Sequence, residues 1–199
     1  MSEGVRIPLV EARMAADIAL VLLGPACERI EVAGSIRREA PDVGDIEVVA
    51  VPRRGAQAVD LFGNAVGEAP DYLHDLCNRL RAEGRLAPRL NKLGHESWGR
   101  KLKWGYLYPT APEDGRIAID IYACDAAQWG ATLAIRTGPA DFSRQLVTAR
   151  PAGGYCPPHL HFRDWRVVER AGGAPLQTPE ESDLFAVLGL DWIEPRDRR

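Results

Sequence analysis

Two stretches decide the fold: residues 30–38 read IEVAGSIRR and residues 43–51 read VGDIEVVAV. Each contains a run of apolar and β-branched residues, and a Gly-Ser pair and a proline lie between the two runs. Apolar runs of this length separated by turn residues are typical of consecutive strands. We therefore predict a strand, a turn and a second strand over residues 29–51.

The second predicted strand carries two acids, Asp45 and Glu47, separated by one residue. Because side chains alternate along a strand, both carboxylates point to the same face. Residues 116–122, RIAIDIY, form a similar strand whose isoleucines share one face, so that Asp120 projects from the other. If the two strands are neighbours, three carboxylates converge, and such a cluster needs a cation.

Carboxylate oxygens suit a hard cation such as Mg²⁺, which takes few protein ligands and fills its shell with water and substrate phosphates. Two ions held by Asp45, Glu47 and Asp120 could activate an attacking hydroxyl and stabilise the leaving oxygen of an in-line displacement. The alternative is that these acids form the solvent side of half-exposed strands. An isolated Asp-x-Glu pair would favour that alternative.

The Gly34-Ser35 turn upstream of the acids favours the metal site. Glycine lets backbone N–H groups approach a phosphate closely, and serine adds a hydroxyl donor. Arg38 follows and offers a cationic clamp. We therefore interpret this turn as a binding site for a triphosphate next to the metal ions.

The rest of the chain predicts further helices and turns. An amphipathic helix is expected over residues 9–23, with Met14, Ile18, Val21 and Leu22 as its apolar stripe. The other expected elements are a helix over residues 71–83, a turn at 112–115, helices on either side of residues 137–139, a hairpin at 165–175, and a helix over 179–188 with Thr178 as N-cap and Glu181 three residues on.

The composition sets limits on the class of protein. A chain of 199 residues with 46% hydrophobic residues suggests one or two compact domains. No apolar run approaches the roughly 20 residues that span a bilayer, so we expect a cytoplasmic protein without a membrane partner.

The four cysteines form no CxxC pair and are expected to be reduced and buried. Cys156, His159 and His161 lie close in sequence, but we interpret this proline-containing stretch as a surface loop.

A net charge of −3 does not favour general binding to DNA, because phosphates are neutralised by Lys and Arg. Any nucleic-acid contact is therefore expected at local basic patches. The candidates are Arg89, Lys92, Arg100, Lys101, Lys103, Arg136, Arg144, Arg150, Arg196, Arg198 and Arg199. Aromatic residues interleave with the basic ones over residues 98–108, which indicates either stacking on bases or a strand with an aromatic core face.

Residues 30–38 together with residues 43–47 resemble the G-S-x-R-R and G-D-x-D signature of the DNA polymerase X family. The resemblance continues through residues 116–122 and through Thr137-Gly138. Residues 178–198 look like the closing helix and tail of the family's thumb.

This resemblance implies an α+β fold with two parts. Residues 1–130 would form a nucleotidyltransferase palm, with a mixed or antiparallel sheet and helices on one side. Residues 131–199 would form a small thumb-like subdomain that binds nucleotide and DNA. The form would be minimal, without the N-terminal helical lyase domain or helix-hairpin-helix units of larger members, and we expect a monomer.

The resemblance also implies roles for individual residues. Asp45, Glu47 and Asp120 would be catalytic and would bind two Mg²⁺ ions, with Mn²⁺ as a possible substitute. The implied nucleotide-binding residues are Gly34, Ser35, Arg38, Gly44, Arg136, Thr137 and Gly138. The expected nucleic-acid contacts are Lys101, Lys103, Trp104 and Arg144.

The activity implied is the addition of a nucleotide from a nucleoside triphosphate to a DNA 3′ hydroxyl, with release of pyrophosphate. The primer end could lie in gapped or nicked DNA, which would place the protein in DNA repair. Two alternatives stay open. The acceptor could be RNA or another hydroxyl, or the chain could be a nucleotide-binding module without catalysis.

Three positions depart from the family pattern or bear on its geometry. Glu47 stands where the family has Asp, and the extra methylene moves the carboxylate by about 1.5 Å, which predicts slow catalysis or a preference for Mn²⁺. Ile135-Arg136 replaces a Tyr-Phe pair that resists ribonucleotides, so sugar selectivity is open. The family's turn here contains a cis bond, and we predict one at Gly138-Pro139.

Overall fold

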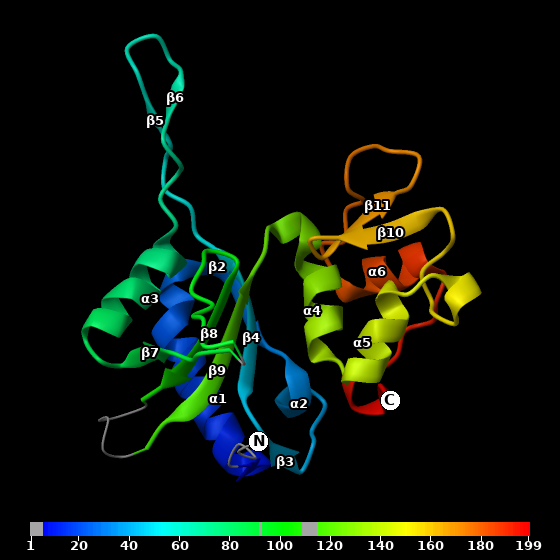
Figure 1. Cartoon of the computed structure of the whole chain (residues 1–199), viewed down its shortest axis with the longest axis horizontal. Coiled ribbons are helices and arrows are strands. Elements are labelled where there is room, and N and C mark those ends of the chain that lie inside the picture. Colours follow the sequence, from blue (N-terminus) through cyan, green and yellow to red (C-terminus); the bar gives the residue numbers. More distant parts are fainter. Residues whose placement is uncertain (1–5, 92, 109–114) are drawn as a thin grey trace.

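The computed structural model describes residues 6–91, 93–108 and 115–199, and its centre is a five-stranded sheet (Figure 1). The strand order is β2-β4-β9-β8-β7, in which β4 and β9 are parallel and the other neighbours are antiparallel. The strands are β2 (Cys27–Val32), β4 (Ile46–Pro52), β7 (Leu86–Pro88), β8 (Leu102–Leu107) and β9 (Ile117–Ala123). The predicted α+β class and mixed sheet are thus confirmed.

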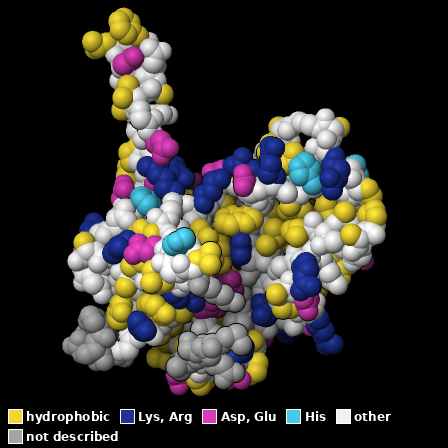
Figure 2. Space-filling model, viewed as in Figure 1, with side chains coloured by type: hydrophobic (Ala, Val, Ile, Leu, Met, Phe, Trp, Pro, Cys, Tyr) yellow, Lys and Arg dark blue, Asp and Glu magenta, His cyan; other side chains and the backbone are white. Residues whose placement is uncertain are grey.

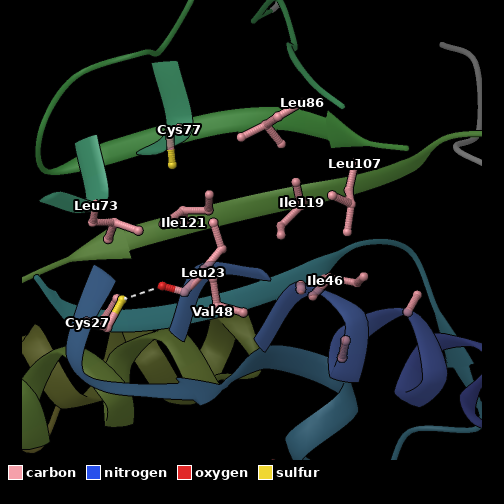
Figure 3. Packing of buried hydrophobic residues seen from close by; sticks show 14 of the residues in the cluster. Leu23, Cys27, Ile46, Val48, Leu73, Cys77, Leu86, Leu107, Ile119 and Ile121 are labelled. Carbon is pink, nitrogen blue, oxygen red and sulfur yellow. Dashed lines mark hydrogen bonds between the residues drawn. The ribbon is translucent and has the colours of Figure 1, made fainter. Parts of the chain in front are cut away.

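Two helices, α1 (Leu9–Leu23) and α3 (Tyr72–Ala82), cover one face of this sheet (Figure 1). Alternate residues of the central strands point into this layer, where side chains of β4 and β9 meet side chains of both helices (Figure 3). The core is built from Leu23, Cys27, Ile46, Val48, Leu73, Cys77, Leu86, Leu107, Ile119 and Ile121. The residues of β4 and β9 that alternate with these point to the opposite face of the sheet.

Helix α1 has the predicted bounds, but its predicted core stripe is wrong. Met14 is 64% exposed and Val21 79% exposed, and Ile18 is also exposed, while Leu22 is partly buried. The buried face consists of Ala12, Ala15, Ala16, Ala19 and Leu23. The alanines and the larger apolar residues both recur at helical spacing, so periodicity alone does not tell which set faces the core. The small alanine side chains let the helix axis come close to the sheet, which is rich in β-branched residues.

Helix α4 (Trp129–Thr137) packs on the other face of the sheet. Trp129 and Leu133 share a buried cluster with Val49 and Tyr122. This contact joins the sheet to the C-terminal part of the chain.

The C-terminal part adds α5 (Ala140–Val147), the hairpin β10 (Leu160–Arg163) and β11 (Arg166–Glu169), and α6 (Glu181–Leu188) (Figure 1). Its buried side chains form a separate cluster that includes Ala131, Phe142, Leu146, Leu160, Val167, Leu184 and Phe185. Each half of the chain thus has its own hydrophobic core, with α4 between them.

The remaining described elements are short. They are β1 (Ile7–Pro8), α2 (Gly34–Arg37), β3 (Asp42–Val43), β5 (Ala58–Val59), β6 (Ala65–Val66), and 3₁₀ turns at Gly24–Ala26, Ala126–Gln128, Arg150–Ala152 and Pro195–Asp197. None of the helices in the described ranges has both the length and the apolar character that a membrane span requires.

Two boundary predictions are corrected. The hairpin lies earlier than residues 165–175, because its turn is Asp164-Trp165, where both residues have positive φ. Helix α6 begins at Glu181 instead of residue 179, since its capping box is formed by Glu180 and Asp183 and Thr178 is buried. The turn predicted at residues 112–115 lies, except for Gly115, outside the described residues.

Strands β5 and β6 form an arm that projects from the sheet, and the sequence pattern did not predict it (Figure 1). At its tip the Asp60 carboxylate accepts hydrogen bonds from the backbone N–H groups of Phe62 and Asn64, at 2.9 and 2.8 Å. Leu61 and Phe62 are fully or almost fully exposed, and hydrophobic side chains cover the tip (Figure 2). A side-chain-capped turn, not a core, holds this tip.

The contact between α4 and α6 yields a stability prediction. A Cβ added at Gly130 would overlap the backbone carbonyl of Glu180, whereas one added at Gly24 would meet nothing within 4 Å. Gly130→Ala should therefore destabilise the protein by about 1–3 kcal/mol, the usual cost of overpacking. Urea unfolding measures this, and Gly24→Ala, expected within about 0.5 kcal/mol of wild type, is the control. Equal stability of the two variants would contradict the packing.

Candidate active site

The three acids singled out in the sequence lie on adjacent strands. The parallel register of β4 and β9 pairs Glu47 with Asp120, and Asp45 lies one residue before β4 begins. All three share the sheet face that is opposite to the core under α1 and α3. The two strands are neighbours, as the predicted convergence of the three carboxylates requires.

Burial makes the charged forms of two of these acids unfavourable. Burial, with the charges of Asp45 and Asp120, raises the pKa of Glu47 to about 7, against the opposing charges of Arg136 and Arg38. Burial also raises the pKa of Asp120 to about 6, although the Arg89 guanidinium beside it acts in the other direction. A cluster of desolvated carboxylates of this kind favours the binding of a cation.

The cation that the structure places against the cluster is Arg89. Its Nη2 lies 2.5 Å from Oδ1 of Asp120 and 3.9 Å from Oδ2 of Asp45. In the part of the chain that the structure describes, no three His, Cys, Asp or Glu side chains are arranged as a ready metal site. The donor types fit Mg²⁺ or Mn²⁺, but in this arrangement Asp120 is paired with the guanidinium.

The Gly34 turn packs directly against Glu47. Strand β2 leads into the single helical turn α2, and Gly34 begins it with a φ of +62°. A Cβ at Gly34 would overlap Oε2 of Glu47, and the backbone N–H of Ala33 donates to the carbonyl of Glu47 at 2.8 Å. Glycine therefore supplies both the left-handed backbone and the space that the longer acid occupies.

A cavity of about 750 Å³ opens beside Glu47 between the two halves of the chain. Arg38, Arg136 and Gly138 line it, together with side chains of α5 and the β10–β11 hairpin. Its volume is within the range of small-molecule sites. Arg38 donates to the carbonyl of Thr137, and the predicted cis bond at Gly138-Pro139 is confirmed.

Arg136 is held in this cavity by two aromatic rings. Its guanidinium carbon lies 4.0 Å from the ring centroid of Tyr122 and 4.7 Å from that of Trp165. Its buried Nε has no hydrogen-bond partner among the described residues. Trp165 was not foreseen from the sequence, because it reaches the site from the turn of a distant hairpin.

Several predicted nucleotide-binding residues do not line the cavity. Thr137 is fully buried, and its hydroxyl accepts a hydrogen bond from Arg37 at 2.8 Å, so its side chain makes a structural contact, and its role in nucleotide binding stays a prediction. Gly44 is exposed outside the cavity lining, and Ser35 is half-buried on α2.

The predicted nucleic-acid contacts are only partly compatible with the structure. Lys103 is 1% exposed and donates to the carbonyl of Gly99, so its predicted contact is wrong. It alternates along β8 with Trp104, which lies opposite Asp120 in the register and faces the site. Lys101 is exposed, and Arg144 lines the cavity and pairs with Asp141.

The remaining basic candidates and the cysteines and histidines have the following positions in the structure. Arg198, a candidate in the basic tail, is buried and bonded to Glu181, so it is not available to a phosphate. Lys92 lies outside the described residues. All four cysteines are free and buried, as predicted, and Cys156 and the nearby histidines form no metal cluster within the described ranges.

The raised pKa of Glu47 predicts how stability depends on pH. Because the unfolded chain loses this proton near the ordinary pKa of 4.5 and the folded chain near 7, the folded state binds more protons between these values, and stability falls as pH rises through them. Glu47→Gln removes this penalty. In EDTA the variant should exceed wild type in stability at pH 8 and match it at pH 4.

Urea unfolding at the two pH values tests this expectation. The exposed Glu28, in β2, supplies the matched variant Glu28→Gln. A stability gain for Glu47→Gln that is the same at both pH values would rule out titration of Glu47 as its cause.

Sequence similarity to known proteins covers most of this chain. Residues 132–199 match the family model of the DNA polymerase beta thumb. The chain is also 27% identical over 172 residues to DNA polymerase lambda of Rattus norvegicus, an alignment that covers 83% of this chain. The chain spans about 28% of the length of that curated relative. These matches agree with the resemblance to the DNA polymerase X family that the sequence motifs carry.

Proposed function

We propose that this chain transfers a nucleotide from a nucleoside triphosphate to the 3′ hydroxyl of DNA and releases pyrophosphate. The observation that carries the proposal is the meeting of Asp45, Glu47 and Asp120 with the Gly34 turn at the edge of an arginine-lined cavity. Acids, a glycine turn and arginines are the groups that phosphoryl transfer requires.

In the proposed mechanism the three acids would hold Mg²⁺ or Mn²⁺. A bound divalent ion would supply a Lewis acid that neutralises phosphate charge and makes the acceptor hydroxyl more acidic. Arg38 and Arg136 lie on the cavity wall next to Glu47 and would bind triphosphate oxygens there. The hydroxyl gives up its proton to solvent, its oxygen forms a bond to the α-phosphorus, and the bond between that phosphorus and the pyrophosphate oxygen breaks.

The acceptor would approach from the other side of Asp120. A second cavity of about 490 Å³ lies there and is lined by Asp120, Arg89, Trp104 and Leu90. An aromatic ring and a guanidinium at its wall suit a base and a phosphate of a strand end. Asp120 borders this cavity and Glu47 borders the nucleotide cavity, so the acids separate the two substrates.

We also propose that residues 1–130 act as the palm and residues 131–199 as the thumb. The thumb match that begins at residue 132 supports this division, as does the start of α4 at Trp129. The separate hydrophobic cluster of the C-terminal part supports it further.

A nucleotide-binding protein without catalysis is the second candidate. The pairing of Arg89 with Asp120 favours it, because a carboxylate held by a guanidinium is not free for a metal ion. Calorimetry that detects triphosphate binding in a protein with no turnover on any acceptor would support this candidate over the enzyme.

The acceptor is tested by offering one labelled triphosphate with gapped DNA, single-stranded DNA or RNA, each with Mg²⁺ and with Mn²⁺. We expect extension of gapped DNA and its loss, by at least about a hundredfold, in Asp120→Asn. The exposed Asp17 of α1 gives the matched control Asp17→Asn, which should retain activity. Extension of RNA alone would change the acceptor, and an active Asp120→Asn would remove this acid from the mechanism.

Sugar selectivity gives a separate prediction. Position 136 carries a guanidinium, a hydrogen-bond donor, instead of an aromatic ring that would exclude an added hydroxyl by its bulk. In competition between a ribonucleoside and a deoxyribonucleoside triphosphate, we expect discrimination of about a hundredfold or less. A much stronger preference for the deoxynucleotide would show that another residue, such as Trp165, excludes the 2′ hydroxyl.

A further inference from the structure

Arg89 occupies an unusual place for a surface arginine. It follows the edge strand β7, and its backbone N–H donates to the carbonyl of Trp104 at 2.8 Å. From that edge its side chain crosses β8 and reaches Asp120 on β9. The side chain is only 28% exposed, so it lies along the sheet instead of extending into solvent.

A single nitrogen of Arg89 faces two of the three acids. Nη2 bonds to Oδ1 of Asp120 at 2.5 Å and approaches Oδ2 of Asp45 to 3.9 Å. Tyr122 makes only a long contact to the other oxygen of Asp120, at 3.4 Å. The positive charge therefore lies between two carboxylates, where a cation that bridges them would also lie.

A divalent ion and the guanidinium cannot both bind Asp120 in this way. Mg²⁺ requires carboxylate oxygens at about 2.0–2.1 Å in near-octahedral geometry. A guanidinium in hydrogen-bond contact with the same oxygen blocks one approach and repels the ion.

The surroundings give Arg89 room to leave. The cavity of about 490 Å³ next to the ion pair is lined by Arg89 itself and by Leu90, Asn91, Leu93 and Trp104. The side chain can turn into this space without any change in the sheet, and the Trp104 ring offers a surface for its charge. The pair is therefore a separable contact.

We propose that Arg89 is a built-in counter-ion, which neutralises Asp120 and Asp45 when no metal is bound and must leave Asp120 before a divalent ion can bridge them. This inference rests on the proposed metal-binding role of these acids. It makes the metal affinity of the site lower than its carboxylates alone would give. It also keeps a cluster of buried acids stable in the metal-free protein.

The test measures binding of Mn²⁺ alone, by calorimetry on the full chain without nucleotide or DNA. Arg89→Ala should bind Mn²⁺ about tenfold more tightly than wild type, since the competing charge is gone. Arg81→Ala is the matched control, because Arg81 also forms a partly exposed ion pair, with Glu96, and contacts none of the three acids in this pair; it should leave the affinity unchanged. Equal affinity of wild type and Arg89→Ala, or no Mn²⁺ binding by either, would overturn the proposal.

Two further measurements keep the result specific. Adding Asp120→Asn to Arg89→Ala should abolish the tighter binding, and retained tight binding would mean that Mn²⁺ binds elsewhere and would overturn the proposal. In a structure with Mn²⁺ bound, the guanidinium should have left Asp120, and a persisting hydrogen bond between them would also overturn it.

The outcome is separable from that of the proposed function. Tighter Mn²⁺ binding by Arg89→Ala without nucleotide incorporation by either protein would support the counter-ion role while the proposed activity fails. Incorporation by wild type with equal Mn²⁺ affinities would overturn the counter-ion role while the proposed activity stands.

Discussion

The structure depends on one buried carboxylate, that of Glu181, which is 5% exposed and shared by two arginines. It accepts hydrogen bonds from Arg37 at 2.6 Å and from the fully buried Arg198 side chain at 2.8 Å. Arg37 also pairs with Glu31 of β2 and donates to Thr137 of α4. Because a buried charge that loses its partner costs about 3–5 kcal/mol, this network holds the C-terminal helix and tail against the turn beside the acids.

Because of this network, the adjacent residues Arg37 and Arg38 have different partners. Arg37 donates to Glu181 and so belongs to the contact between the two halves. Arg38 donates to the carbonyl of Thr137 and lines the cavity, where its charge lowers the pKa of Glu47 against the effect of burial. The cavity lies between the same two halves, so its width depends on a contact between residues that do not line it. A change at Glu181 would therefore alter the site through geometry alone.

Much of the site could be predicted from the sequence because it depends on the alternation of side chains along each strand. The alternation of residues placed Asp45, Glu47 and Asp120 on one face, and the register confirms it. The same rule, applied to β8, would have put Lys103 on the core side as soon as Trp104 was placed beside Asp120. Arg89 could not be found this way, because its contact crosses the full width of β8 and depends on where an edge strand ends.

The two departures from the family pattern, at positions 47 and 136, are physically linked. Glu47 extends further than an aspartate and can do so because Gly34 has no side chain to meet it. Its longer reach puts a desolvated carboxylate at the cavity wall, and Arg136 is among the charges that lower its pKa against the effect of burial. An aromatic residue at position 136 would stack but would not offset this charge. The arginine charge at position 136, together with that of Arg38, therefore favours the ionised form of the longer acid.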